Sequence, residues 1–336
     1  MCNNRLKKKK HQLRRMRREL KRRKKQRKRN KRVLTRPNVE KKRRKIAKKR
    51  FVTKTAPKHF SFIDNTDDML NYLLDCKREL HNYENILCDI SNISELSSDA
   101  IAILAACINE DSFKGKYATI KGNAPTEKSL NQQFTESGFY KFVNPNNPLR
   151  NNQDKKRNLF HHESHYKVMP KVARDACQYI SDGITEVTSD LYEMLIESMS
   201  NTNNHAAGKK LSGQTKWWLY TYNDPNGNIA YTFIDLGVGI FDSIPFSIYK
   251  KFITSKRNKD LALDLLDGKI KSSEKIDNNM RGRGIPQIAS NSTKQHFLRA
   301  YIISNNVKID LKSHSATELK NDFFGTMLYW EVSCNK

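Results

Sequence analysis

The sequence lacks three features that would each assign the protein to a functional or structural class. No run of 18 apolar residues occurs, so no membrane-spanning helix is predicted. The six cysteines form no CxxC pair, and several stand in apolar runs such as ILCDI and ILAACI, which predicts buried free thiols in a reducing compartment. The segment HHESH at 161–165 is not HExxH, so the zinc-protease motif is missing.

Acidic residues are nearly missing from the first 60 positions. This segment holds 30 of the 63 Lys and Arg residues but only Glu19 and Glu40, so it accounts for the whole formal charge of +28. Such a charge density cannot bury an apolar core, and we expect residues 1–58 to form a disordered polybasic arm. The arm has no apolar segment or cleavage-like site, as a secretory signal would. It is also too Lys-rich and Ser-poor for a typical transit peptide.

Nucleic acid is the partner that best fits this arm, because Lys and Arg neutralise phosphates and release counterions. An anionic membrane surface and a merely solubilising tail are the alternatives. Aromatic residues are absent from the first 50 positions, so the arm has no ring on which to stack a base and should bind without regard to sequence. We therefore predict a cytoplasmic protein that associates with the nucleoid or RNA through residues 1–58.

Residues 59–143 alternate between strand-like and helix-like segments. Strands are predicted for HFSFI, NILCDIS and KYATIKG, and helices for DDMLNYLLDCKREL, SSDAIAILAACINE and TEKSLNQQFTESGFYKFV. Strands separated by helices indicate an α/β unit. Residues 144–166 are rich in Asn, Pro and charge, which predicts a linker.

The pattern changes to α+β in residues 167–336. Helices are expected at roughly 170–182 and 185–204. The runs KWWLYTYND and IAYTFIDLG flank a PNGN turn, the strongest hairpin signal in the chain, and LRAYIIS, NNVKIDLK and GTMLYWEVS predict three more strands. Trp217 and Trp218 alternate across a strand, so we expect one in the core and one exposed. The predicted fold class is thus α/β followed by α+β, with a mixed, largely antiparallel sheet.

Four short motifs follow one another in this second part. Glu197 and Asn201, in ESMSNTNNHA, lie one turn apart on one face of the second helix. The motif DLGVG (235–239) follows a strand, RGRG (281–284) opens a helix, and GT (325–326) opens the last strand. Glycines let the main chain approach a phosphate or purine closely, and a helix start offers free N–H groups to a polyphosphate.

The polar residues of these motifs suit a nucleotide site. Asp235, at the end of an apolar strand, can accept a hydrogen bond from an exocyclic amine. Asn201 offers a neutral oxygen to a hard cation such as Mg²⁺. Glu197 is placed to hold or deprotonate a water near a terminal phosphate. The alternatives are a solvated helix residue for Glu197 and a turn former for Asp235, and His205 is interpreted as an ordinary helix-end residue.

The ordered set resembles the ATPase superfamily of gyrase, heat-shock chaperones, histidine kinases and mismatch-repair proteins (GHKL), the Bergerat fold. ESMSNTNNHA resembles its N box, DLGVGI its G1 box, RGRGI its G2 box, and GTMLYW the strand that carries its last motif threonine. The resemblance covers roughly residues 170–334. It implies an α/β sandwich, with helices on one face of the sheet, that binds ATP and Mg²⁺.

The resemblance also implies a role for each matching residue. Asn201 would bind Mg²⁺, Glu197 would be the catalytic base, and residues 242–280 would form the ATP lid. The adenine pocket would be formed by Asp235, Gly237, Gly239 and Thr326, and the phosphates would be faced by Gly282, Arg283 and Gly284. The sequence departs from the kinase pattern at Pro286, where glycine is frequent, and it has no recognisable phospho-acceptor helix.

Residues 59–143 resemble, on fewer positions, a STAS domain, the module of anti-sigma-factor antagonists. DISNISELSSDAIAIL resembles its strand, loop and helix, where the loop often carries a phosphorylatable DSSG. The corresponding tetrad here is SSDA (97–100), with Ser98 at the phosphoserine position. The alternative for Ser98 is a plain helix cap.

These features predict a regulatory protein that binds Mg-ATP and either hydrolyses it or transfers its γ-phosphate to a hydroxyl of a protein partner, in the manner of anti-sigma kinases. One alternative is a module that holds ATP without turnover and switches conformation. Another is a nucleic-acid-associated protein in which the arm is the tether and nucleotide is only regulatory. The pairing of these two modules is typical of bacterial proteins.

Overall fold

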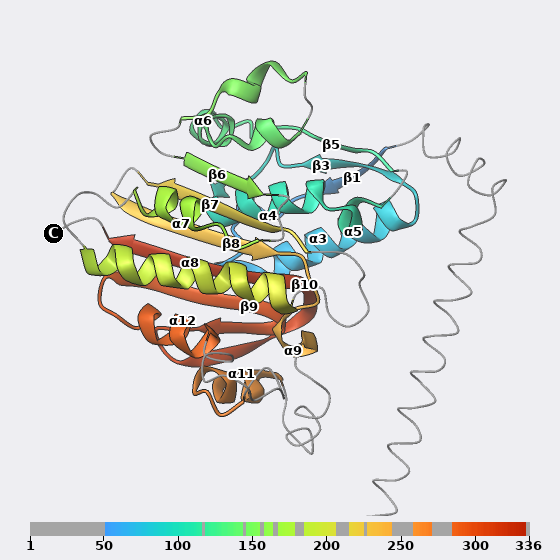
Figure 1. The fold of residues 1–336 in the computed structure, drawn as a ribbon. Helices are drawn as coiled ribbons and strands as arrows, with labels where there is room; N and C mark the ends of the chain where they lie inside the picture. Colours follow the sequence, from blue (N-terminus) through green and yellow to red (C-terminus); the bar gives the residue numbers. More distant parts are fainter. Residues whose placement is uncertain are drawn as a thin grey trace, which may run out of the picture.

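The structure, a computed structural model, describes residues 51–115, 118–143, 146–154, 158–163, 167–178, 185–205, 215–224, 227–243, 258–270 and 284–333. It combines parallel and antiparallel sheets with helices, which confirms the predicted mixed α/β and α+β class. Figure 1 shows a small sheet at the N-terminal end of the fold and a larger sheet that carries most of the C-terminal half.

The first unit is a three-stranded parallel sheet with helices on one face. Its strands lie in the order β1 (Phe51–Thr55), β3 (Asn85–Asp89), β5 (Ile120–Gly122). Its helices are α3 (Thr66–His81), α4 (Ser98–Asn109), α5 (Asp111–Lys114) and α6 (Lys128–Glu136), the last followed by the 3₁₀ turns η1 (Phe139–Phe142) and η2 (Pro148–Asn151). A separate parallel pair joins β2 (His59–Phe60) to β4 (Glu95–Leu96).

Helix α4 is the centre of this unit. Ser97 is its N-cap, and the Ser97 side chain accepts a hydrogen bond from the main-chain N–H of Ala100. Every residue from Ser98 to Cys107 is buried, because the small and aliphatic side chains of this helix pack on all sides. A helix that is apolar all round must be covered on more than one side, and α4 lies between the small sheet and the large one (Figure 1).

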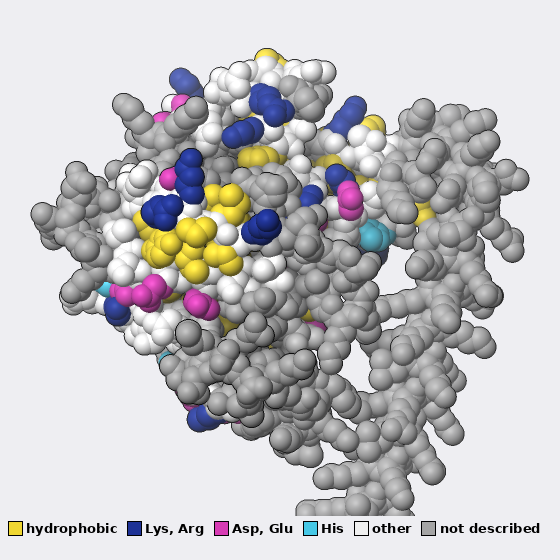
Figure 2. All heavy atoms as spheres, in the orientation of Figure 1, with side chains coloured by type: hydrophobic (Ala, Val, Ile, Leu, Met, Phe, Trp, Pro, Cys, Tyr) yellow, Lys and Arg dark blue, Asp and Glu magenta, His cyan; other side chains and the backbone are white. Residues whose placement is uncertain are grey.

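The second unit is a five-stranded sheet whose neighbouring strands all pair antiparallel. The order is β6 (Asn158–Glu163), β7 (Trp217–Asn223), β8 (Asn228–Asp235), β10 (Ser315–Ser333), β9 (Phe297–Asp310). One face is covered by α7 (Pro170–Cys177), α8 (Thr185–His205), α11 (Asn258–Leu266) and α12 (Gly284–Ser292), and the short α9 (Ile240–Ser243) follows β8. Partly exposed apolar side chains gather over α7 and α8 on the face shown in Figure 2.

The five-stranded sheet is buried on both faces. Trp217 and Leu219 pack with α7 and α8, whereas Trp218 and Tyr220 pack with α3 and α4 of the first unit. Both tryptophans are 1% exposed, so the expectation that one of them is exposed is wrong. The helices on one face agree with the prediction, and the cover of α3 and α4 on the other face was not predicted. The five-stranded sheet therefore contributes one face to the core of its own unit and the other face to the core of the first unit.

Contacts along the seam between the units are both apolar and polar. The rings of Phe62 and Phe323 are buried with their centroids 5.2 Å apart. At the edge of the seam, Arg299 of β9 forms an ion pair with Asp64. Further along, the Asn321 side chain donates a hydrogen bond to Asn71 of α3 over 2.6 Å. Strands β9 and β10 are thereby joined to the N-terminal unit along much of their length.

Several predicted boundaries differ from the structure. Residues 51–55, which the sequence analysis placed in the arm, form β1 and pair with β3. Residues 158–163, which it placed in the linker, form β6 and pair with β7. The runs LRAYIIS and NNVKIDLK form one strand, β9, instead of two. For β1 and β6 the pairing partner is distant in sequence, so local composition could not reveal it. Strand β9 pairs with the next strand, β10, and continues through the polar residues at 304–306.

Two expectations from the sequence, on membrane-spanning helices and on the state of the cysteines, can be checked on the described residues. None of their helices is long and apolar enough to cross a membrane. The four cysteines within them, Cys76, Cys88, Cys107 and Cys177, are buried free thiols, as the apolar sequence context predicted.

Candidate functional site

Helix α8 carries the first two predicted site residues beside two buried hydroxyls. Its apolar residues Leu191, Met194, Leu195 and Met199 are fully buried against the sheet. The hydroxyl of Ser198, also buried, donates to the carbonyl of Met194 over 2.6 Å. Glu197 and Asn201 are half-buried and lie at the margin of this packed face. The helix thus holds both polar side chains at the border between the core and solvent.

The start of α12 lies directly against these two side chains. A Cβ atom placed on Gly284 would come within 2.7 Å of Glu197 Oε2 and 3.0 Å of the Asn201 amide nitrogen. A larger residue at this position would have to displace the ends of these two side chains, because such contacts are shorter than van der Waals distances. The structure therefore brings Glu197, Asn201 and Gly284 together.

The Asn201 side chain has unused hydrogen-bonding capacity. Its amide nitrogen is buried, and it has no hydrogen-bond partner among the described residues. The oxygen and nitrogen of an amide exchange places by a flip of the group, so either end can face the space beside Gly284. A buried polar atom without a partner is costly, and this one fits a ligand with polar groups.

Asp235 ends β8 as a buried carboxyl, 5% exposed. Its Oδ1 accepts a hydrogen bond from the Gly237 N–H over 3.0 Å, and its Oδ2 lies 3.2 Å from the Thr202 hydroxyl of α8. Burial raises the pKa of this carboxyl from 3.8 to about 6, although the hydrogen bonds from Gly237, Thr202 and the Thr326 main chain act in the opposite direction. At neutral pH it is a hydrogen-bond acceptor in a nearly dry setting.

Thr202 links the two halves of the site. It follows Asn201 in α8 and reaches Asp235, while the same hydroxyl lies 3.1 Å from the carbonyl of Ser198. A hydroxyl has one proton, so it can donate to only one of these oxygens at a time. Glu197 and Asn201 therefore lie beside Ser198 and Thr202 on neighbouring faces of one helix, and Thr202 contacts Asp235.

Thr326 lies opposite Asp235 in the pairing of β10 with β8. The preceding Gly325 is required by close packing, because a Cβ there would lie 2.0 Å from the main-chain oxygen of Asp235. Thr326 is 7% exposed, and its hydroxyl lies 3.1 Å from the hydroxyl of Ser304 in β9. The GT motif thus lets β10 approach the end of β8 without a side chain between them.

Ser304 and Asn305 of β9 are site residues that the sequence analysis missed. Asn305 Oδ1 accepts from the N–H of Phe241 over 3.1 Å, and its Nδ2 donates to the carbonyl of Val238. Ser304 Oγ accepts from the N–H of Ile240 over 2.8 Å. Gly239 has a φ of +82°, and a Cβ on it would lie 2.3 Å from Asn305 Oδ1. These two side chains therefore fix the loop that follows Asp235.

The remaining predicted residues have separate outcomes. Gly282 and Arg283 lie outside the described residues, as do 244–257 and 271–280 of the expected lid. Ser98 is 7% exposed in the first turn of α4, away from the site described above, and the cap of that helix is Ser97. The backbone of His205 lies at the end of α8.

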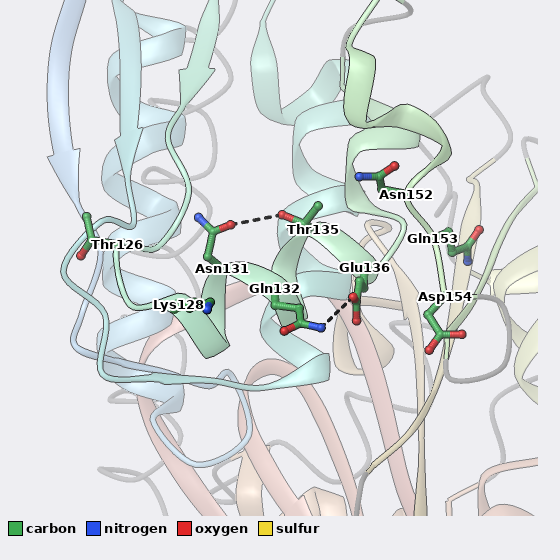
Figure 3. Close-up of a pocket in the computed structure, with 9 residues that line it drawn as sticks. All are labelled: Thr126, Lys128, Asn131, Gln132, Thr135, Glu136, Asn152, Gln153 and Asp154. Carbon is green, nitrogen blue, oxygen red and sulfur yellow. Dashed lines mark hydrogen bonds between the residues drawn. The ribbon is translucent and has the colours of Figure 1, made fainter.

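A separate groove of about 660 Å³ lies between α6 and residues 152–154 (Figure 3). Its lining is polar and includes Asn131, Gln132, Asn152 and Gln153. Figure 3 shows the hydrogen bond from Gln132 to Glu136, 2.9 Å long, along the exposed side of the helix. None of the residues predicted from the sequence motifs lines this groove.

Comparison with known proteins gives limited information about this site. The sequence matches no protein-family model and no curated protein. Among solved structures, the chain is similar to the histidine kinase domain of a blue-light-activated histidine kinase from Erythrobacter litoralis, with 15% identity and a TM-score of 0.22. The match covers 44% of this chain and 45% of that one, so the chain spans less than half of the structure it matches. A functional assignment therefore depends on the residues of this chain.

Proposed function

We propose that this protein binds ATP with Mg²⁺ between α8 and the ends of β8 and β10, and that it hydrolyses ATP or transfers its γ-phosphate to a protein hydroxyl. The observation that supports this is the convergence of segments far apart in sequence. The Thr202 hydroxyl contacts Asp235. The side chains of Glu197 and of Asn201, which precedes Thr202, lie against Gly284. A solvated helix face or a simple turn would not bring these residues together.

Asp235 would select adenine. A buried carboxylate accepts a hydrogen bond from the exocyclic amine of adenine, whereas guanine presents a carbonyl oxygen at that position and would be repelled. The Gly237 N–H donates to one oxygen of the carboxylate and the Thr202 hydroxyl to the other. A carboxylate oxygen can accept two hydrogen bonds, so the oxygen beside Thr202 would accept a second one from the base. The main-chain turn held by Asn305 keeps the neighbouring wall of the pocket in place.

Asn201 would hold Mg²⁺ through its amide oxygen, and the residues present fit this role. The ion prefers oxygen ligands and keeps several waters, so one neutral protein ligand suffices alongside phosphate oxygens. When bound, the ion would supply positive charge that neutralises the phosphates. Glu197, one turn before Asn201, would orient and deprotonate a water or a hydroxyl of the acceptor protein. The free N–H groups at the start of α12 would face the phosphates.

A switch without turnover is the second candidate, and one contact favours it. Leu236, directly after Asp235, packs against the core that α3 and α4 form on the opposite face of the sheet. A change in the loop on nucleotide binding would therefore reach the N-terminal unit through a single residue. The two candidates share the binding site and differ only in whether Glu197 does chemistry.

ATP binding and turnover in matched variants test the proposal. Asn201→Ala should abolish Mg²⁺-dependent ATP binding, while Asn203→Ala, an exposed neighbour, should leave it unchanged. Glu197→Gln should keep binding within about threefold and reduce turnover by about 10²- to 10⁴-fold. Glu193→Gln is the control, at an exposed residue one turn earlier on the same helix face, where the side chain accepts a hydrogen bond from Asn291. Binding without turnover in the wild type would establish the switch. Failure of the wild type to bind ATP would refute the proposal.

A further inference from the structure

Helices α7 and α8 lie side by side on the surface of the second unit. At one end of the pair, the main-chain nitrogen of Met169, the residue before α7, lies 3.4 Å from the Met199 sulfur of α8. At the other end, the Cys177 sulfur lies 3.6 Å from the Thr188 carbonyl oxygen. The start of α7 therefore contacts the second half of α8 and its end contacts the first half, so the two helices run antiparallel.

An apolar strip follows the junction of these two helices. It consists of four partly exposed side chains that pack against the core from one side, Val168, Met169, Tyr192 and Ile196. Tyr192 and Ile196 lie four residues apart and share one flank of α8. That flank faces α7, because Thr188, which contacts Cys177, lies one turn before Tyr192. Figure 2 shows the apolar side chains open on the surface over α7 and α8.

Positive charge borders the apolar strip on the α7 side. Lys171 and Arg174 are both exposed. Arg174 lies three residues before Cys177, so it is on the flank of α7 that faces α8. The acidic residue of this helix, Asp175, lies roughly 160° from Cys177 around the helix axis and therefore faces away from α8. The charge that α7 offers to the apolar strip is thus positive.

Negative charge borders the apolar strip on the other side. Glu193 of α8 is exposed, and its carboxylate accepts a hydrogen bond from the Asn291 amide of α12 over 3.3 Å. This side chain is therefore on the flank of α8 that faces α12, away from α7. Within the described part of the chain, neither Arg174 nor Glu193 forms an ion pair. Figure 2 shows Lys and Arg side chains above the apolar strip and acidic side chains below it.

Arg174 and Glu193 lie at the same level along the two helices. Arg174 is three residues before Cys177, whose partner is Thr188, and five residues after Met169, whose partner is Met199. Counted from the two ends of the antiparallel pair, Arg174 is level with positions 191 to 194 of α8. The two borders of the apolar strip therefore carry opposite charges directly across from each other.

Such a surface is complementary to itself. A two-fold axis in the plane of the surface and parallel to the helices would place α7 of one copy over α8 of the other. The two apolar strips would then meet at the centre, and Arg174 of each copy would face Glu193 of the other. A two-fold axis perpendicular to the helices would bring like charges together, which costs free energy.

We propose that two copies of this chain associate through the apolar strip, with Arg174 of each copy paired to Glu193 of the other. A partner with charge of a single sign would be repelled by one border of the strip, whereas a second copy satisfies both borders. The proposal does not depend on ATP binding, because Glu197 and Asn201 lie against the start of α12 and not along the flank that faces α7.

Analytical ultracentrifugation of the full chain over a range of protein concentrations tests the proposal. A salt concentration of about 0.3 M screens long-range repulsion between two highly basic chains. The wild type should show a reversible monomer–dimer equilibrium. Arg174→Glu and Glu193→Lys should each weaken the dimer by about tenfold or more, because each places like charges together at two symmetry-related positions. Combining both changes in one chain should restore most of the affinity, since each pair forms again with its signs exchanged.

A variant in the apolar strip and matched controls complete the set. Tyr192→Ala should weaken the dimer by about tenfold or more, because it removes the central aromatic side chain. Lys128→Glu reverses an exposed charge on α6, and Leu298→Ala removes an apolar side chain that is 45% exposed on β9. Neither control should change the dimer. If Tyr192→Ala melts at a lower temperature than the wild type, the charge variants at the exposed positions decide the question.

Three outcomes would overturn the proposal. One is a wild type that stays monomeric up to the highest concentration at which it is soluble. A second is a dimer that none of the variants in the apolar strip and its borders weakens, which would place the interface elsewhere on the chain. The third is a combined variant that dimerises no better than Arg174→Glu alone, which would show that these two residues do not meet.

Discussion

Replacement of Asp235 by asparagine should stabilise the free protein and weaken its binding of ATP. The carboxyl is 5% exposed, and burial raises its pKa from 3.8 to about 6. The folded state therefore binds the proton more tightly than the unfolded state does. The stabilising contribution of this group is fully present below about pH 4 and is lost as pH rises through about 6.

The magnitude follows from the change in pKa. A rise of roughly 2 pH units corresponds to about 3 kcal/mol of folding free energy lost between pH 4 and pH 7. Asparagine has the same shape and carries no charge, so this loss should disappear. Its oxygen can still accept from Gly237, and its amino group can donate to Thr202, whose hydroxyl then donates to the Ser198 carbonyl. Gly237 and Thr202 both keep a partner, and the Thr326 main chain keeps one where its acceptor is the retained oxygen, so the gain in stability at pH 7 should reach at most about 3 kcal/mol.

The same replacement should reverse the preference for the base. The amino group of asparagine would meet the exocyclic amine of adenine, which places two donors face to face. Loss of that hydrogen bond should cost about 1–3 kcal/mol, so ATP should bind about 5- to 150-fold more weakly, and GTP should gain relative to ATP.

Two measurements check these expectations independently. Urea unfolding without nucleotide, from pH 4 to pH 8, gives the difference in stability between wild type and Asp235→Asn. Other carboxyls whose pKa burial raises, the buried Asp99 and the half-buried Glu110, contribute equally to both proteins and cancel. Identical pH dependence in the two proteins would refute the buried, charged state of Asp235. An unchanged affinity for ATP would refute its role in reading adenine, whatever the stability data show.

Three further changes test the site and the shared sheet. Gly325→Ala should destabilise the fold by about 1–3 kcal/mol or more in urea unfolding, because its Cβ meets main-chain oxygen at 2.0 Å; Gly122→Ala, where the nearest atom is 3.5 Å away, should cost much less. Asn305→Ala removes the hydrogen-bond partner of the Phe241 N–H and of the Val238 carbonyl. The KM for ATP should therefore rise about tenfold, on the scale of one lost hydrogen bond, while kcat changes little. An unchanged KM would show that the loop after Asp235 holds its conformation without these two hydrogen bonds. Phe62→Ala should cost about 3–5 kcal/mol in one cooperative transition by both far-UV and tryptophan signals, and two separate transitions would contradict the shared sheet.

Local patterns in the sequence were enough to predict most elements of the second unit. Helix α8 was predicted because Leu191, Met194 and Leu195 recur at helical spacing, and the hairpin because PNGN separates two apolar runs. The site followed from the order of the motifs, since a single glycine pair would have been weak evidence. What the sequence could not supply was the partner that each site residue touches.

The sequence contains a signal that the large sheet is covered on both faces, and the sequence analysis misinterpreted it. Residues 217–221 and 229–235 are buried without interruption, which is typical of strands packed on both faces. In the run WWLYTY, the alternation of Trp217 and Trp218 was interpreted as one tryptophan in the core and one in solvent. Ser304 and Asn305 were missed for a related reason. A polar SNN triplet inside the apolar run of β9 indicates a special position, and Asn305 adopts a positive φ of 50° there.

The cover of the large sheet by α3 and α4 also determines an order of events during synthesis. These helices leave the ribosome first, but α3 packs against β10, whose last residues follow about 190 positions after the end of the first unit at residue 143. At a translation rate of 5–20 residues per second, the apolar surface of α3 stays uncovered for roughly 10–40 s until β10 is synthesised. A nascent chain with such a long-lived apolar surface is a natural client for a chaperone that binds near the exit tunnel. Synonymous codons that slow translation across β9 and β10 should therefore lower the yield of folded protein more than the same codons placed in β1.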